Sequence, residues 1–145
     1  MNDNNKHRNL TASIVSLFPN AVDSIVHSSI LGRAIDAGIL QVDKEDIRLH
    51  AHDKHQKVDD GPYGGGAGQV MKVDVVHDAI QAVKARHDAS HQNSEGSSRV
   101  LLMDPAGKPF TQESAERLSG YNHLIFVCGR YEGIDARIHE HVDEA

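Results

Sequence analysis

The chain has 145 residues, of which 39% are hydrophobic and 25% charged, as is ordinary for one soluble domain. No apolar run approaches the roughly 20 residues of a membrane-spanning helix, so we expect a cytoplasmic protein without a membrane partner. A net charge of −6 argues against a nucleic-acid binder that works by bulk charge, although a local basic patch stays open. The one cysteine, Cys128, excludes an internal disulfide and is expected as a buried thiol rather than a nucleophile.

The N-terminal third predicts a strand followed by short helices, as in α/β domains. Residues 1–10 are polar and are expected to form a disordered tail, which leaves 11–145 as the folded domain. Thr11 to Phe18 predicts a buried strand. Apolar residues at helical spacing from Val22 to Ile35 indicate two short helices, because glycines interrupt them. Leu40 to Val42 and Ile47 to His50 alternate weakly and are expected as short strands.

The rest of the chain predicts further strands and helices. Val73 to about His87 carries the apolar spacing of an amphipathic helix, and a polar connector follows up to Ser98. Arg99 to Met103 and His123 to Cys128 are expected as strands, and between them Thr111 to Ser119 is expected as a helix capped by Thr111. Ile134 to Val142 is expected as the last helix. Strand, helix, strand predicts parallel strands buried on both faces.

The glycine-rich segment Asp59 to Gly68 is the first candidate for chemistry. Its five glycines would let the backbone approach a ligand closely, but on composition alone the segment is a flexible surface loop. No Gly-Lys-Ser/Thr sequence follows, as a phosphate-binding loop would require. Asp59 and Asp60 could act as a general base, a helix cap or solvated loop charges, and the sequence does not decide between these roles.

The second candidate is a pair of turns that follow the last two strands. Cys128 to Asp135 and Met103 to Lys108 each carry glycine directly after an apolar strand. In parallel sheets, ligands gather at the carboxyl ends of the strands. Arg130 could pair with a phosphate, Tyr131 could stack on a base, and Glu132 could accept hydrogen bonds from guanine. Solvated turns without function are the alternative.

The 11 histidines do not by themselves indicate a metal site. His50-x-His52-x-x-His55 and His139-x-His141 have a superficial likeness to metal ligands, but cysteine or carboxylate partners at set spacings are missing. We therefore expect scattered surface histidines and no metal site. His87 and His91 belong to no cluster in the sequence.

Together these motifs resemble those of the bacterial tRNA guanine-N1 methyltransferases, enzymes of the knotted SPOUT class. The matching segments occur in the family's order over about Ile14 to Glu144; they are Ser16 to Pro19, Gly32 to Ala34, Val58 to Gly68, Met103 to Gly107 with Pro109 to Gln112, and Cys128 to Asp135. The resemblance implies an α/β fold, a parallel sheet with flanking helices and a trefoil knot. It also implies methyl transfer from S-adenosylmethionine to N1 of the guanosine 3′-adjacent to the tRNA anticodon, by a homodimer. Magnesium is associated with the family, although no residue here indicates it.

The resemblance also assigns roles to individual residues. The residues it places at the S-adenosylmethionine site are Gly129, Tyr131, Gly133, Leu102, Met103, Asp104 and Pro105. The residues it places near the tRNA substrate are Glu132, Arg130, Asp59, Gly65, Gly66 and Gly68. Three positions depart from many relatives, which have proline at Ala67, arginine at Gly61 and methionine at Gln69.

The resemblance further implies that the chain is truncated before the knot closes. Relatives continue past Glu144 with a knot-closing segment, an aspartate that acts as the base and a helical tRNA-binding domain. We therefore expect no catalytic residue in this chain and no activity from it alone. The alternative is that it serves as a non-catalytic dimerising or nucleotide-binding module.

Overall fold

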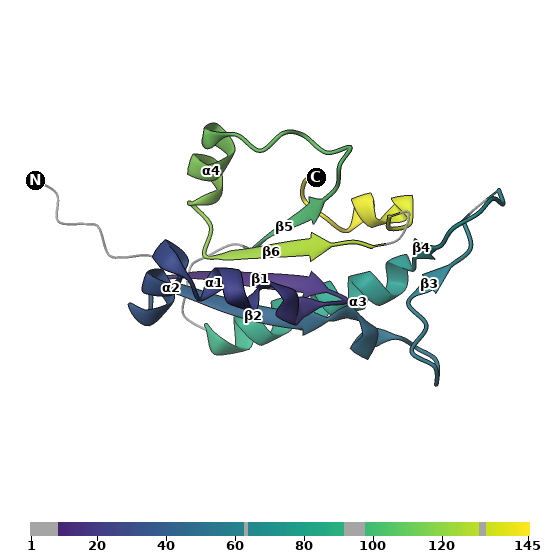
Figure 1. The fold of residues 1–145 in the computed structure, drawn as a ribbon, viewed down its shortest axis with the longest axis horizontal. Helices are drawn as coiled ribbons and strands as arrows, with labels where there is room; N and C mark the ends of the chain where they lie inside the picture. The colour runs from purple at the N-terminus through teal and green to yellow at the C-terminus, as the bar shows by residue number, and fades with distance from the viewer. Residues whose placement is uncertain (1–8, 63, 92–97, 131–132) are drawn as a thin grey trace, which may run out of the picture.

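A parallel sheet of four strands forms the centre of the molecule (Figure 1). The structure is a computed structural model that describes residues 9–62, 64–91, 98–130 and 133–145. The strands are β1 (Leu10–Ser16), β2 (Leu40–Asp46), β5 (Ser98–Met103) and β6 (His123–Cys128), in the spatial order β2-β1-β6-β5. The mixed α/β architecture with a parallel sheet is thus confirmed.

Each face of the sheet carries its own apolar cluster. The 18-residue helix α3 (Val73–Ser90) lies along one face, where Val75, Val76 and Ile80 are fully or almost fully buried. Val15, Val100 and Ile125, with other strand residues, belong to the same cluster. On the other face, Leu101 and Leu124 of the sheet pack with Leu118 of α4 (Gln112–Leu118). Alternate residues of β5 and β6 thus point to opposite clusters, as expected of strands buried on both faces.

The helices predicted between residues 22 and 119 agree with the structure except in their bounds. Between β1 and β2 the chain forms η1 (Pro19–Val22), α1 (Asp23–Val26) and α2 (Ser29–Asp36), so two short α-helices are confirmed. The break between them lies at His27 and Ser28, and not at Gly32, which is inside α2. Helix α3 runs one turn beyond His87, up to Ser90. Thr111 caps α4 as predicted, because its side chain accepts a hydrogen bond from the Ser114 N–H. Among the described residues, no helix combines the length and apolarity needed to cross a bilayer.

Two strand boundaries near the N-terminus differ from the prediction. The first strand begins at Leu10 rather than Thr11, because the Leu10 N–H donates to the Ile39 carbonyl and so joins β2. The same strand ends at Ser16, two residues before Phe18. Leu40 to Val42 belong to a longer strand, which continues to Asp46.

Two predicted elements adopt other structures. Ile47–His50 is a 3-10 helix (η2) and not a strand, because the Asp46 carboxylate accepts from the Arg48 N–H and turns the chain. The predicted helix Ile134 to Val142 is shortened to η3 (Ala136–Glu140), also a 3-10 helix. The expected loop Asp59 to Gly68 includes β3 (Asp59–Asp60), which pairs antiparallel with β4 (Val70–Met71).

Residues 143–145 pair with the outer edge of β5, which the sequence prediction did not include. The Leu102 N–H donates to the Glu144 carbonyl at 2.9 Å, and Leu101 and Glu144 form a parallel bridge. Short as it is, this segment continues the sheet beyond β5.

Three histidine rings stack against one another at the amino ends of β1, β5 and β6, which corrects the expectation of scattered surface histidines. His123 is fully buried and stacks on His87 at 4.0 Å between ring centroids, and His91 stacks on His87 at 4.1 Å. Hydroxyl groups of Ser13 and Ser98 lie 2.7 and 2.9 Å from the two ring nitrogens of His123. His123 is thus a core residue with both polar atoms satisfied.

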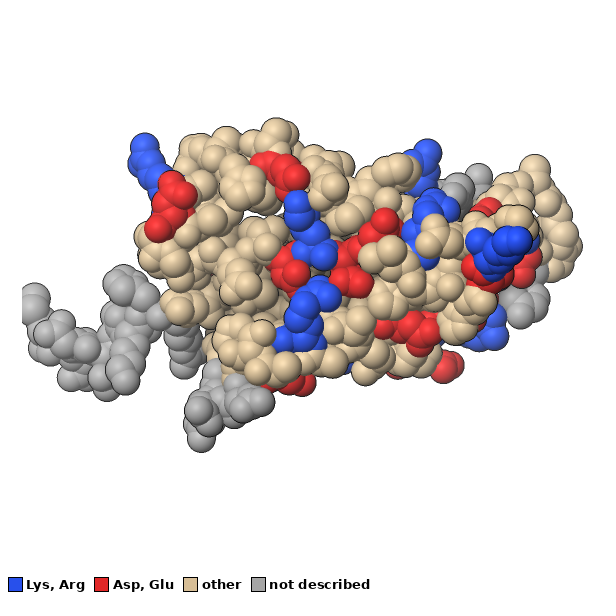
Figure 2. Space-filling model, turned by 90° about the horizontal axis from the view of Figure 1, so that it is seen from below, with Lys and Arg blue, Asp and Glu red and all other residues tan. Residues whose placement is uncertain are grey.

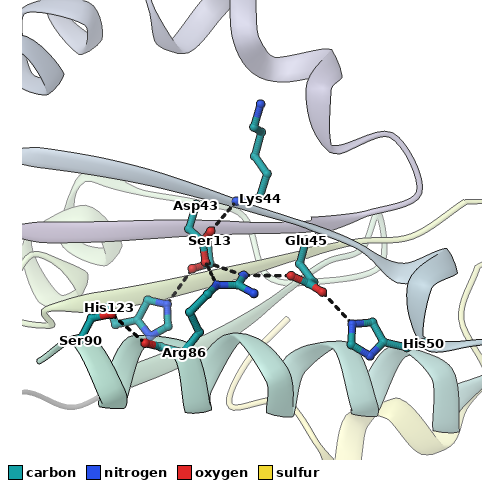
Figure 3. Close-up of polar contacts among 8 residues, drawn as sticks. All are labelled: Ser13, Asp43, Lys44, Glu45, His50, Arg86, Ser90 and His123. Atoms are coloured by element: carbon teal, nitrogen blue, oxygen red, sulfur yellow. Dashed lines mark hydrogen bonds and ion pairs between the residues drawn. The ribbon is translucent and has the colours of Figure 1, made fainter. Parts of the chain in front are cut away.

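Charged residues join α3 to β2 near His123 (Figure 3). The Arg86 guanidinium donates to Asp43 at 2.7 Å and lies 2.9 Å from Glu45, while His50 lies 2.7 Å from the other oxygen of Glu45. The hydrogen bond that Arg86 donates to Asp43 contributes most to raising the pKa of Arg86. This network holds the long helix against the edge strand of the sheet.

The pKa of His123 is lowered from 6.5 to about 4, chiefly by burial of the ring and then by the neighbouring His87. Between pH 6.5 and about pH 4 the unfolded chain binds a proton at His123 that the folded chain does not. The contribution of neutral His123 to stability is therefore fully present above the unfolded pKa of 6.5 and is lost as the pH falls toward the folded pKa of about 4. Going from about pH 7 to about pH 5 should cost about 2 kcal/mol from this group. Urea unfolding at both pH values measures the loss.

The matched variants are His123→Gln, which keeps groups able to bond both serines, and His27→Gln at an exposed position. The first should lose clearly less stability on acidification than the wild type, and the second should lose as much. Equal acid sensitivity of all three proteins would refute the assignment to His123.

Candidate active site

The turns that follow β5 and β6 meet at the carboxyl edge of the sheet and enclose a cavity of about 480 Å³. Strands β5 and β6 pair in register up to Met103 and Cys128, so both turns start at the same level. The lining residues that sequence analysis had singled out are Leu102, Met103, Asp104, Pro105, Gly129, Arg130 and Gly133. The structure therefore brings two separate sequence motifs into one cavity, which we call the edge cavity.

One predicted residue of the two turns lies on another side than expected, and two others cannot be placed. Arg130, predicted on the substrate side, lines the edge cavity. Its guanidinium lies 4.7 Å from the ring centroid of the half-exposed Phe18. Tyr131 and Glu132 lie outside the described residues, so their predicted roles stay predictions.

Four lining residues had no role in the sequence analysis: Ala106 and Ile134, which lie within the two predicted turns, and Ile138 and His139, which lie outside them. Ile138 is fully buried and belongs to the main core, so its apolar character signalled packing rather than a site. His139 was considered only as a metal ligand. Ile138 and His139 lie near the Met103 turn only because of the fold, and no local sequence pattern predicts this proximity.

The glycine-rich loop between β3 and β4 adopts a backbone that other residues rarely use. Gly64, Gly65, Gly66 and Gly68 have φ values of 82°, 83°, 110° and 106°. A Cβ atom at Gly64, Gly65 or Gly66 would meet nothing within 4 Å, so the glycines serve backbone conformation rather than close packing in this structure.

Met71 connects the glycine-rich loop with the turn after β6. Its N–H donates to the Gly133 carbonyl at 3.0 Å, and its carbonyl accepts from the Asp135 N–H at 3.0 Å. The Arg130 N–H lies 3.2 Å from the Met71 sulfur, and the whole side chain is buried. Through this one residue, two segments about sixty positions apart are held together.

A second cavity, of about 930 Å³, lies between the β3–β4 hairpin and residues 134–137. We call it the hairpin cavity. It shares Ile134 with the edge cavity, and Asp60, Gly61, Gly64 and Lys72 contribute to its lining. The predicted substrate residues Asp59, Gly65, Gly66 and Gly68 are not among its lining residues, although they belong to the same hairpin and its loop.

The ionisable groups near the cavities limit the chemistry that they can perform. Asp135, in the hairpin cavity, is hydrogen-bonded by Arg137, which lowers its pKa to about 2. A carboxylate of such low pKa is a weak proton acceptor. Cys128 is half-buried rather than buried, and desolvation raises its pKa, which disfavours the reactive thiolate.

Among the described residues no metal centre is evident, and the face drawn in Figure 2 carries no broad basic surface. In the part of the chain that the structure describes, no three His, Cys, Asp or Glu side chains come together as a metal site would require. On the face drawn in Figure 2, lysine and arginine side chains are interleaved with aspartate and glutamate. Pairs such as Lys44–Asp23 and Arg86–Asp43, each at 2.7 Å, show the same balance.

Comparison with known proteins identifies the family. The model of the family described as tRNA (Guanine-1)-methyltransferase TrmD matches residues 10–145. Proteins named tRNA (guanine-N(1)-)-methyltransferase from Pediococcus pentosaceus and Listeria innocua are 45% and 46% identical to this chain over 131 and 129 residues. These alignments cover 90% and 89% of the chain but 51% and 50% of the relatives, so the chain spans about half the length of the curated relatives it matches. The chain belongs to the tRNA (guanine-1)-methyltransferase family.

Proposed function

We propose that the protein methylates N1 of the guanosine 3′-adjacent to the tRNA anticodon, and that this chain supplies the methyl-donor cavity and part of the substrate side. The observation that carries the proposal is the edge cavity, in which the turns after β5 and β6 meet. Ligand sites of open parallel sheets lie at this edge. The names of the relatives support tRNA guanine as the substrate.

The edge cavity suits S-adenosylmethionine in size and chemistry. Its volume of about 480 Å³ falls within the range of small-molecule sites. Leu102, Pro105 and Ile138 offer apolar surface for the adenine ring and the methionine chain, while the two turns offer backbone polar groups. When bound, S-adenosylmethionine supplies an electrophilic methyl group on a sulfonium sulfur.

The hairpin cavity is the proposed place of the target guanosine. It adjoins the edge cavity at Ile134, so a guanine there would lie next to the methyl donor. Lys72 is on its wall and offers a positive charge to the tRNA backbone. We further propose that the glycine-rich loop contacts tRNA or a partner subunit in a homodimer, and that the reaction uses Mg²⁺, as the family resemblance implies.

Methylation of N1 also requires a group that accepts the N1 proton. The pairing of Asp135 with Arg137 makes this carboxylate unsuitable. We therefore propose that the base belongs to the part of the full-length enzyme that corresponds to the relatives' remaining length. The 145 residues then bind the methyl donor without turnover.

Filling the edge cavity should weaken the binding of S-adenosylhomocysteine, the product that the methyl donor leaves. Ala106 lies exposed on the wall of the cavity, so Ala106→Phe should lower the affinity for S-adenosylhomocysteine at least about tenfold, roughly 1.4 kcal/mol. Ala85→Phe, on an exposed position of α3, is the control and should bind as the wild type does. Isothermal titration calorimetry measures both. Undiminished binding by folded Ala106→Phe would place the ligand elsewhere.

The full-length protein should form 1-methylguanosine in a tRNA whose anticodon is followed by guanosine, and the 145-residue chain should not. Mass spectrometry of nucleosides after incubation with S-adenosylmethionine gives the readout. Absence of 1-methylguanosine with the full-length protein would contradict the proposed reaction. Binding of S-adenosylhomocysteine without turnover is the result expected of the short chain. Turnover by the short chain would refute the assignment of the base.

A further inference from the structure

The segment of residues 143–145 contacts both β5 and the turn that lines the edge cavity. The Asp143 N–H donates to the Val100 carbonyl at 2.9 Å, and the Asp143 carboxylate accepts from the Val100 N–H at 2.7 Å. The Leu102 N–H donates to the Glu144 carbonyl at 2.9 Å. The segment is thus fixed along β5 up to the point where the strand enters the Met103–Lys108 turn.

The same segment supports the turn itself. The Lys108 N–H donates to the Ala145 carbonyl at 3.0 Å. A Cβ atom at Gly107 would lie 2.6 Å from the Ala145 carbonyl carbon, so only glycine allows this approach. Within the turn, Asp104 accepts from the N–H groups of Ala106 and Gly107 at 2.9 Å. The cavity wall at Met103 to Ala106 is therefore backed by residue 145.

The Glu144 side chain holds the segment in place through two arginines. Arg117, on α4, donates to both carboxylate oxygens at 2.7 and 3.0 Å. Arg99, on β5, donates from Nε at 2.9 Å and has a second nitrogen 2.8 Å from the same oxygen. The Arg117 hydrogen bond, followed by that of Arg99, lowers the pKa of Glu144. About a quarter of the carboxylate side chain is exposed, so water screens the pair only in part.

We propose that Glu144, clamped by Arg99 and Arg117, is a positioning residue that sets the shape of the Met103–Lys108 turn and thereby the affinity of the edge cavity for S-adenosylmethionine. This inference depends on the proposed function of the cavity. None of the three side chains lines the cavity, so they act through the backbone of residues 102–108. Charged fork-to-fork pairs of this kind restrict geometry as well as stabilise it.

The test compares two variants that each remove one carboxylate from an arginine pair. Glu144→Gln keeps the size of the side chain and removes its charge. Asp43→Asn does the same to the Arg86 pair on the edge strand β2, far from the turn along the sheet order. We expect Glu144→Gln to weaken binding of S-adenosylhomocysteine about tenfold by calorimetry. Asp43→Asn should bind as the wild type does, even at an equal loss of thermal stability.

Two further measurements separate positioning from general destabilisation. Glu144→Gln combined with Arg117→Gln should lose little more affinity than the first substitution alone, because both break the same contact. Hydrogen exchange of the Leu102 and Lys108 amides should be faster in Glu144→Gln and unchanged in Asp43→Asn. Affinity lost equally in Glu144→Gln and Asp43→Asn, or unchanged exchange at these amides, would overturn the proposal.

Failure of the proposed function gives a different result. If the wild-type chain does not bind S-adenosylhomocysteine, the edge cavity is not the donor site of this chain. Accelerated exchange of the Leu102 and Lys108 amides in Glu144→Gln would then still support the clamp on the turn but refute its role in donor affinity.

Discussion

The parallel pairing of β5 with β6 fixes where the site can form. The register runs from Ser98–His123 to Met103–Cys128, so the chain leaves both strands at the same edge and the same height. Two short turns, neither able to surround a ligand alone, therefore face each other across one cavity. The burial of both strand faces makes this register costly to shift, because a slip of one residue would exchange the side chains of the two apolar clusters.

Local signals allowed several elements to be predicted from sequence. The period of Val75, Val76 and Ile80 identifies α3, and the cap at Thr111 identifies the start of α4. At Ile47 and Leu49 the prediction was wrong, because their alternation with polar residues indicates a strand with one buried face. In the 3-10 helix the two side chains point to different environments: Ile47 is fully buried, while Leu49 is 68% exposed. The Asp46 cap decides the structure there, and its side-chain bond is invisible in an apolar pattern.

The candidate site could be predicted only where its chemistry lies close together in sequence. Leu102 to Pro105 and Gly129 to Gly133 carry glycine or proline directly after apolar strands, so both turns were recognisable. Met71 has no such signal. Its role comes from backbone partners near residues 133–135, and a buried methionine in a sequence is indistinguishable from ordinary core. The stacking of the histidines at positions 87, 91 and 123 was not predicted either, because two segments that are distant in the sequence bring them together.

The pairing of residues 143–145 with β5 has a consequence for the order of events during synthesis. Arg99 leaves the ribosome 45 residues before Glu144, its partner. Until then, the outer edge of β5 offers unpaired N–H and C=O groups on an apolar strand, which is the kind of edge that recruits other chains. Pairing of this edge of β5 is therefore a late step that waits for the synthesis of residues 143–145.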